Sequence, residues 1–72
     1  MNQALLRSVM ARYSETQADL AELLKLSLSR TNAKINCYGG AQFTQAEIWA
    51  IKDHYNLSAD DVDAIFFAKK VS

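Results

Sequence analysis

The stretch from Thr16 to Asn36, TQADLAELLKLSLSRTNAKIN, decides the fold. It predicts a short helix, a tight turn and a second short helix. Thr16 is the expected N-cap of the first helix, and Asp19 three residues later completes a capping box. The apolar residues of this helix recur at helical spacing and form one stripe: Leu20, Ala21 and Leu24.

The second helix of this stretch has one apolar face. Ser27 is its expected N-cap, and Thr31 and Ile35 lie one turn apart on the face that packs inward. The other side chains point away from that seam: Ser29, Arg30, Asn32, Ala33, Lys34 and Asn36. A braced helix with short polar and basic side chains outside is what reading the DNA major groove requires.

The flanking segments predict three more helices. Asn2 caps a first helix that runs to Tyr13, and residues 37–42 form a loop in which Gly39-Gly40 ends the preceding helix. The inward residues expected for the first helix are Leu5, Leu6, Val9, Met10 and Tyr13.

Two further helix starts combine a capping box with a hydrophobic staple. The boxes are Thr44 with Glu47 and Ser58 with Asp61; the staples are Phe43 with Ile48 and Leu57 with Val62. The residues expected to face the core from these two helices are Ile48, Ile51, Tyr55, Val62, Ile65 and Phe66.

These motifs carry a family resemblance. Thr16-Gln17, Leu20-Ala21, Leu24, Leu26-Ser27 and Ile35-Asn36 resemble the helix-turn-helix of lambda-repressor-like (Cro-type) DNA-binding proteins. The second half is similar to small Cro-like or modulator-of-repression proteins of temperate phages of Gram-positive bacteria. The residues that carry this likeness are Phe43-Thr44, Glu47-Ile48, Asn56-Leu57-Ser58 and residues 65–72, IFFAKKVS. The resemblance implies an all-α, five-helix domain spanning residues 1–72, with its helix-turn-helix at about 16–36.

Three positions depart from the family pattern. Lys25 stands where the family usually has the turn glycine, and left-handed φ costs a residue with a side chain about 1 kcal/mol. Thr31 replaces a larger apolar residue under the second helix, and Cys37-Tyr38 separate Asn36 from the glycine pair. The turn and the seat of the second helix are therefore the places where the structure is expected to differ from the family.

Composition excludes several classes of function. In 72 residues there is room for one domain, and no apolar run approaches the roughly 20 residues of a membrane span. We therefore expect a soluble, intracellular protein, and the resemblance to phage regulators implies the cytoplasm of a bacterial host. One cysteine and one histidine offer no metal site, no cofactor site and no catalytic group, so the chain is not expected to be an enzyme or to bind a small-molecule substrate. His54 is expected to be a solvated helix residue.

Charge favours DNA binding only weakly. Eight basic and eight acidic residues give a formal net charge of zero, whereas non-specific DNA affinity comes mainly from basic residues. Residues 1–43 hold five basic residues against three acidic ones, and the segment from Leu23 to Phe43 contains no acid.

Two hypotheses about function follow. In the first, the protein binds double-stranded operator DNA as a regulator of the lysogeny switch. Its candidate base-reading residues are Leu28, Ser29, Arg30, Asn32 and Ala33, with Arg30 expected to make a bidentate contact to guanine. Its candidate backbone contacts are Gln17, which the resemblance implies, and Lys34, Asn36 and Tyr38.

In the second hypothesis the same fold is an antirepressor or co-repressor that docks on a phage repressor. Its motivation is the zero net charge and a leucine in the first turn of the second helix. The candidate partner contacts are Leu28, Tyr38, Trp49, Phe67 and Val71. A homodimer or a heterodimer is compatible with either hypothesis, and an antitoxin of a two-gene module is a third alternative on this fold.

Overall fold

The computed structural model describes residues 1–67. Its helices are α1 (Gln3–Arg12), α2 (Gln17–Leu24), α3 (Leu28–Asn36), a short 3-10 turn η1 (Tyr38–Gly40), α4 (Gln45–His54) and α5 (Ala59–Phe66). These residues contain no strand, which confirms the expected all-α class and the five α-helices. Lys69, Lys70 and Val71, the last a candidate partner contact, lie outside the described residues.

Every α-helix begins at a side-chain cap that the sequence predicted. The cap residues, whose side-chain oxygens each accept a backbone N–H of the first turn, are Asn2, Thr16, Ser27, Thr44 and Ser58. The capping boxes of α2, α4 and α5 are complete in both directions. Each cap satisfies N–H groups that the helix itself leaves unpaired, so these boundaries are set locally.

Two helices end in left-handed residues that are not glycine. Lys25 ends α2 with φ 57° and Cys37 ends α3 with φ 56°. At the first of these turns the N–H of Leu26 donates to the carbonyl of Ala21 at 2.9 Å, closing the helix end. The expectation that Gly39-Gly40 ends α3 was wrong, because α3 already ends at Asn36 and the left-handed Cys37 is its C-cap.

The core lies where all five α-helices converge. Its buried hydrophobic residues are Leu6, Val9, Met10, Leu20, Ala21, Ile35, Ile48, Ile51, Tyr55, Leu57, Val62 and Ile65. Thr31 is fully buried among them, and its hydroxyl donates to the carbonyl of Ser27 at 3.0 Å. The helix itself thus satisfies the hydrogen-bonding need of this buried hydroxyl.

Leu5 and Tyr13 do not belong to this core, contrary to the sequence-based expectation. Both are exposed, because the buried stripe of α1 is the narrower one formed by Leu6, Val9 and Met10. Tyr13 instead lies against Tyr55, with ring centroids 5.2 Å apart, and its hydroxyl donates to the Tyr55 carbonyl at 2.8 Å.

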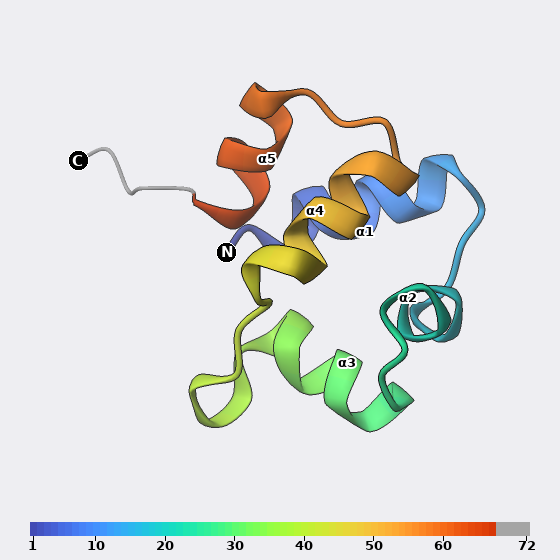
Figure 1. Cartoon of the computed structure of the whole chain (residues 1–72), viewed down its shortest axis with the longest axis vertical. Coiled ribbons are helices and arrows are strands. Elements are labelled where there is room, and N and C mark those ends of the chain that lie inside the picture. The colour runs from blue at the N-terminus through green and yellow to red at the C-terminus, as the bar shows by residue number, and fades with distance from the viewer. Residues whose placement is uncertain (68–72) are drawn as a thin grey trace.

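The helices form two groups around α4. Figure 1 shows α1, α4 and α5 together in one half of the molecule, and α2 and α3 in the other half. The N–H of Asn2 donates to the Ile65 carbonyl at 2.7 Å and joins the start of α1 to α5. α3 lies at the lower edge, away from α5 (Figure 1). None of the helices in residues 1–67 has the length and apolarity that crossing a membrane requires.

Candidate nucleic-acid interface

α3 is held in place from one side. Thr31 and Ile35 are both fully buried, one turn apart, and α3 packs chiefly against α2. The turn between the two helices contains only Lys25, Leu26 and Ser27, so their relative orientation is tightly restricted. The burial of Thr31 and Ile35 confirms the inner face that the sequence predicted for α3. The opposite face is therefore held in a fixed orientation.

The first turn of α3 faces solvent. Leu28 is 53% exposed, and Ser29 and Arg30 are also exposed. Within residues 1–67 the Arg30 guanidinium makes no ion pair. Another macromolecule can therefore contact these three side chains without breaking a side-chain hydrogen bond or ion pair within residues 1–67.

Further along α3 the polar side chains bind one another. Asn36 donates to the side-chain and backbone oxygens of Asn32 at 2.8 and 2.9 Å, and accepts a bond from Arg7 Nη2 at 3.4 Å. Asn32, Ala33 and Asn36 are each half-buried. This network orients the two side-chain amides. Because some of their donors and acceptors are already used, the amides can bind a ligand with all of their polar groups only after these bonds are broken.

Lys34 is engaged within the molecule. Its Nζ lies 2.6 Å from Glu47 Oε1, and the two side chains are only 12% and 14% exposed. Burial would raise the pKa of Glu47, but the bonds from Lys34 and from the Thr44 backbone N–H outweigh it and hold that pKa below its ordinary value. The pair joins α3 to the start of α4, so a phosphate contact by Lys34 requires this pair to open.

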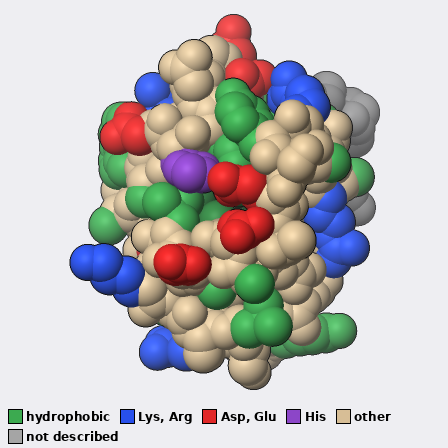
Figure 2. Space-filling view, turned by 90° about the vertical axis from the view of Figure 1, so that its right-hand side faces the viewer, with side chains coloured by type: hydrophobic (Ala, Val, Ile, Leu, Met, Phe, Trp, Pro, Cys, Tyr) green, Lys and Arg blue, Asp and Glu red, His purple; other side chains and the backbone are tan. Residues whose placement is uncertain are grey.

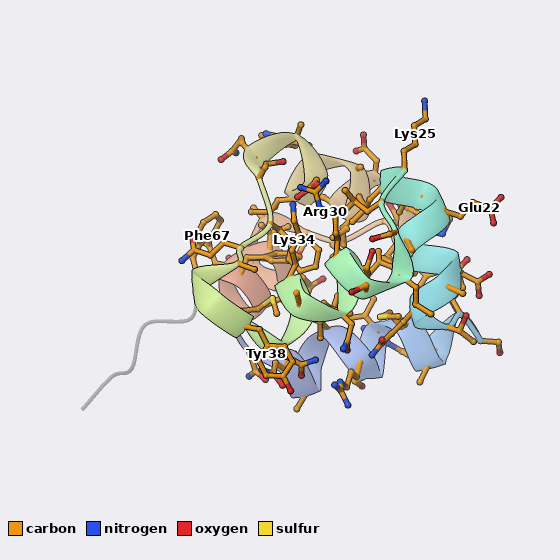
Figure 3. The ribbon with its side chains drawn as sticks, turned by 90° about the horizontal axis from the view of Figure 1, so that it is seen from below. Glu22, Lys25, Arg30, Lys34, Tyr38 and Phe67 are labelled. Carbon is orange, nitrogen blue, oxygen red and sulfur yellow. The ribbon has the colours of Figure 1, made fainter. Side chains whose placement is uncertain are left out.

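The two remaining backbone candidates lie on the elements that precede and follow α3 in the chain. Gln17 is half-buried at the first position of α2, and Tyr38 is exposed in η1, just beyond the end of α3. Figure 3 shows Tyr38 projecting at one end of α3, while Lys25 projects from the α2 end. An exposed cation at Lys25 was not among the residues selected from the sequence, although it is the residue that replaces the turn glycine.

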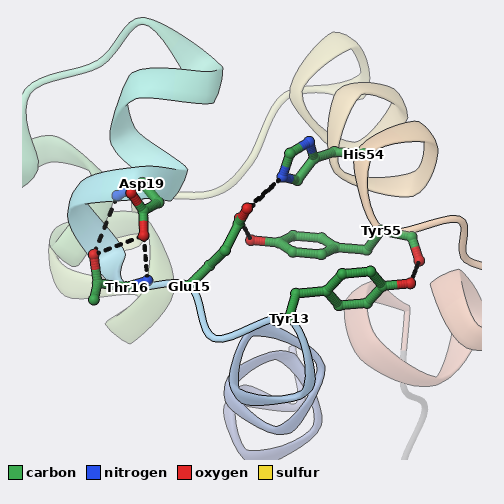
Figure 4. Close-up of polar contacts among 6 residues, drawn as sticks. All are labelled: Tyr13, Glu15, Thr16, Asp19, His54 and Tyr55. Carbon is green, nitrogen blue, oxygen red and sulfur yellow. Dashed lines mark hydrogen bonds and ion pairs between the residues drawn. The ribbon is translucent and has the colours of Figure 1, made fainter.

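A second polar cluster was missed at the sequence level. His54 is an exposed residue of α4, as expected, but its Nε2 lies 2.9 Å from both carboxylate oxygens of Glu15, and the Tyr55 hydroxyl donates to Glu15 at 2.8 Å (Figure 4). The bonds from His54 and then Tyr55 lower the pKa of Glu15, while burial first and then Glu15 raise that of Tyr55. No spacing rule could have paired Glu15 with His54, which is 39 residues away.

This cluster belongs to an acidic face. Figure 2 shows acidic side chains gathered beside His54, and Asp19 lies near enough to oppose the ionisation of Glu15. Negative charge repels phosphate, so this face is unsuited to nucleic acid. The outer side of α3, whose charged side chains are basic, is the better candidate.

Metal-ligating side chains form no cluster in the part of the chain that the structure describes. No group of three or more His, Cys, Asp or Glu side chains in residues 1–67 is placed to hold a metal ion. No protein-family model, curated protein or solved structure matches the chain. The role of α3 has therefore to be inferred from its own geometry.

Proposed function

We propose that the protein is a transcriptional regulator of the phage lysogeny-switch type, a lambda-repressor-like domain that binds operator DNA through α3. The observation that carries the proposal is the division of α3 into two faces. Thr31 and Ile35 fix the helix from behind, while Leu28, Ser29 and Arg30 are exposed in its first turn. A helix seated in the major groove contacts base edges with its N-terminal residues.

Each reading residue has a chemical role in this proposal. Arg30 donates two hydrogen bonds to O6 and N7 of a guanine, and Ser29 and Asn32 bind neighbouring base edges. Leu28 and Ala33 contact thymine methyl groups. Arg30 is the main contributor, because a bidentate pair contributes roughly 1–3 kcal/mol of discrimination between bases.

Backbone contacts then fix the register of the helix on the duplex. Gln17 of α2 and Tyr38 of η1 bind phosphate oxygens, and Asn36 contributes through its amide. Lys34 joins them only when it leaves Glu47, so its net contribution is smaller than that of an unpaired lysine. Few phosphate contacts predict weak non-specific affinity and a shallow salt dependence for a monomer.

A second candidate function is protein–protein antirepression through the same face. It is favoured by the Lys34–Glu47 pair, which removes a cation from α3, and by the exposed Leu28, which suits an apolar pocket. In this alternative a phage repressor binds the outer side of α3 and thereby loses access to its own operator. An antitoxin that binds a toxin through α3 is the third alternative.

The deciding experiment is selection from a random-sequence duplex library at low salt, followed by titration of the enriched site. We expect a discrete consensus, and we expect Arg30→Ala to weaken it by roughly 5- to 150-fold, the equivalent of 1–3 kcal/mol. Arg12→Ala, which removes an exposed guanidinium at the end of α1 instead, is the matched control. If no site is enriched, direct DNA reading fails. A gel shift of a phage repressor on its operator, relieved by this protein, then supports antirepression.

A further inference from the structure

A shallow apolar groove lies between α4 and α5, away from α3. Its volume is about 190 Å³. Ile48 and Val62 form its floor, and both also belong to the buried core. The groove therefore continues the hydrophobic core to the surface, and it is not part of the candidate interface described above.

Each side of the groove carries one aromatic ring and one charge. On α4 these are Trp49 and Lys52, whose ammonium lies 5.7 Å from the centre of the indole ring. On the α5 side they are Asp63 and Phe67. Trp49 is 53% exposed and Phe67 is 50% exposed. Aromatic side chains usually bury large areas, and those on the surface are enriched at protein interfaces. The folded chain thus leaves half of each ring in water.

The charges on the two sides have opposite sign. Neither Lys52 nor Asp63 makes an intrachain ion pair in the described part of the chain. A surface that carries its own complementary charges on two opposite edges fits a copy of itself. Two-fold interfaces place the same patch of both subunits in contact, so they require such self-complementarity.

The charge pattern also selects the direction of the two-fold axis. An axis along the groove places the α4 side of one copy over the α5 side of the other, so that Lys52 faces Asp63 twice. An axis across the groove places Asp63 over Asp63, which is repulsive. The first arrangement also covers Trp49 and Phe67 with the apolar edge of the second copy.

We propose that a second copy of this chain docks on the α4–α5 groove and forms a two-fold dimer, with reciprocal contacts between Lys52 and Asp63. The dimer buries the two exposed rings and leaves the outer side of α3 uncovered. No residue of α3 lines the groove, so the dimer proposal can be tested independently of what α3 binds.

Analytical ultracentrifugation of the full chain, from micromolar to millimolar concentration, tests the dimer. Trp49 is the single tryptophan, so its fluorescence is a second readout and is expected to shift to shorter wavelength as the dimer forms. We expect Lys52→Asp and Asp63→Lys each to raise the dissociation constant at least about tenfold, because each places like charges together twice. Lys25→Asp, the same charge change outside the groove, is expected to leave the constant unchanged.

Mixing the two single variants provides the sharper test. In a heterodimer of Lys52→Asp with Asp63→Lys, both reciprocal contacts again join opposite charges. We expect the mixture to associate with about the affinity of the unchanged protein, although each variant alone does not. Circular dichroism of each variant verifies the fold. A monomer at all concentrations, single variants that dimerise normally, or a mixture that stays monomeric would each overturn the proposal.

Discussion

Replacing Glu47 by glutamine separates two roles of one side chain. Glu47 accepts the Thr44 backbone N–H at 2.8 Å as part of the capping box of α4, and it pairs with Lys34 at 2.6 Å. Glutamine preserves the acceptor that a capping box needs, but it removes the negative charge. Glu47→Gln therefore tests the ion pair while leaving the start of α4 intact.

The expected loss of stability follows from the exposure of the pair. Exposed ion pairs contribute about 0.2–1 kcal/mol, whereas removing one partner of a fully buried pair costs about 3–5 kcal/mol. With side chains 12% and 14% exposed, this pair lies between those limits, and we expect a loss of about 1–2 kcal/mol. For a domain of this size, each kcal/mol lowers Tm by about 4–8 °C.

Thermal and urea denaturation followed by circular dichroism measures this loss. A double-mutant cycle with Lys34→Gln is expected to give a coupling energy near 1 kcal/mol. Glu22→Gln is the matched control, since Glu22 is exposed and has no ion-pair partner in residues 1–67, and it is expected to change stability by less than about 0.5 kcal/mol. A coupling energy of zero would refute the role assigned to the pair.

The same variant has an expected effect on DNA binding. Without Glu47 the Lys34 ammonium is free to bind a phosphate, and the slope of log K against log salt is expected to steepen by about 0.9. Titration of the selected site at several salt concentrations measures the slope. An unchanged slope would mean that Lys34 lies away from the DNA backbone.

Two further predictions concern backbone strain and acid stability. Lys25→Gly is expected to stabilise the fold by about 0.5–1 kcal/mol, because glycine adopts the φ of 57° without strain. Lys25→Ala is the control, since alanine retains the strain and is expected to give no such gain. Equal melting temperatures for the two variants would contradict this reasoning. Hydrogen bonds from His54 and then from Tyr55 lower the pKa of Glu15 in the folded state. The ionised Glu15 carboxylate therefore contributes fully to the free energy of unfolding above its ordinary pKa of 4.5, and this contribution is lost as the pH falls below that value. Denaturation between neutral pH and about pH 2 is expected to show a shallower acid loss for Glu15→Gln than for the unchanged protein; identical profiles would exclude this contribution.

The sequence by itself determined the helix starts and most of the buried face of each helix. Caps such as Thr16 with Asp19 act within one turn, so the chemistry of four neighbouring residues is sufficient to locate them. The same applies to Thr31 and Ile35, whose spacing on α3 already placed them on one face. Such features need no knowledge of what lies elsewhere in the chain.

Tertiary structure alone decided which polar side chains remain available. Lys34 is a candidate phosphate contact on the sequence, but folding places Glu47 beside it. Folding also places Glu15 beside His54, which stays exposed. Likewise, Leu5 and Tyr13 match the helical period of the core, yet they lie outside it because the other helices cover a narrower stripe of α1. Contacts across 13 and 39 residues depend on how whole helices pack, and no local pattern encodes that packing.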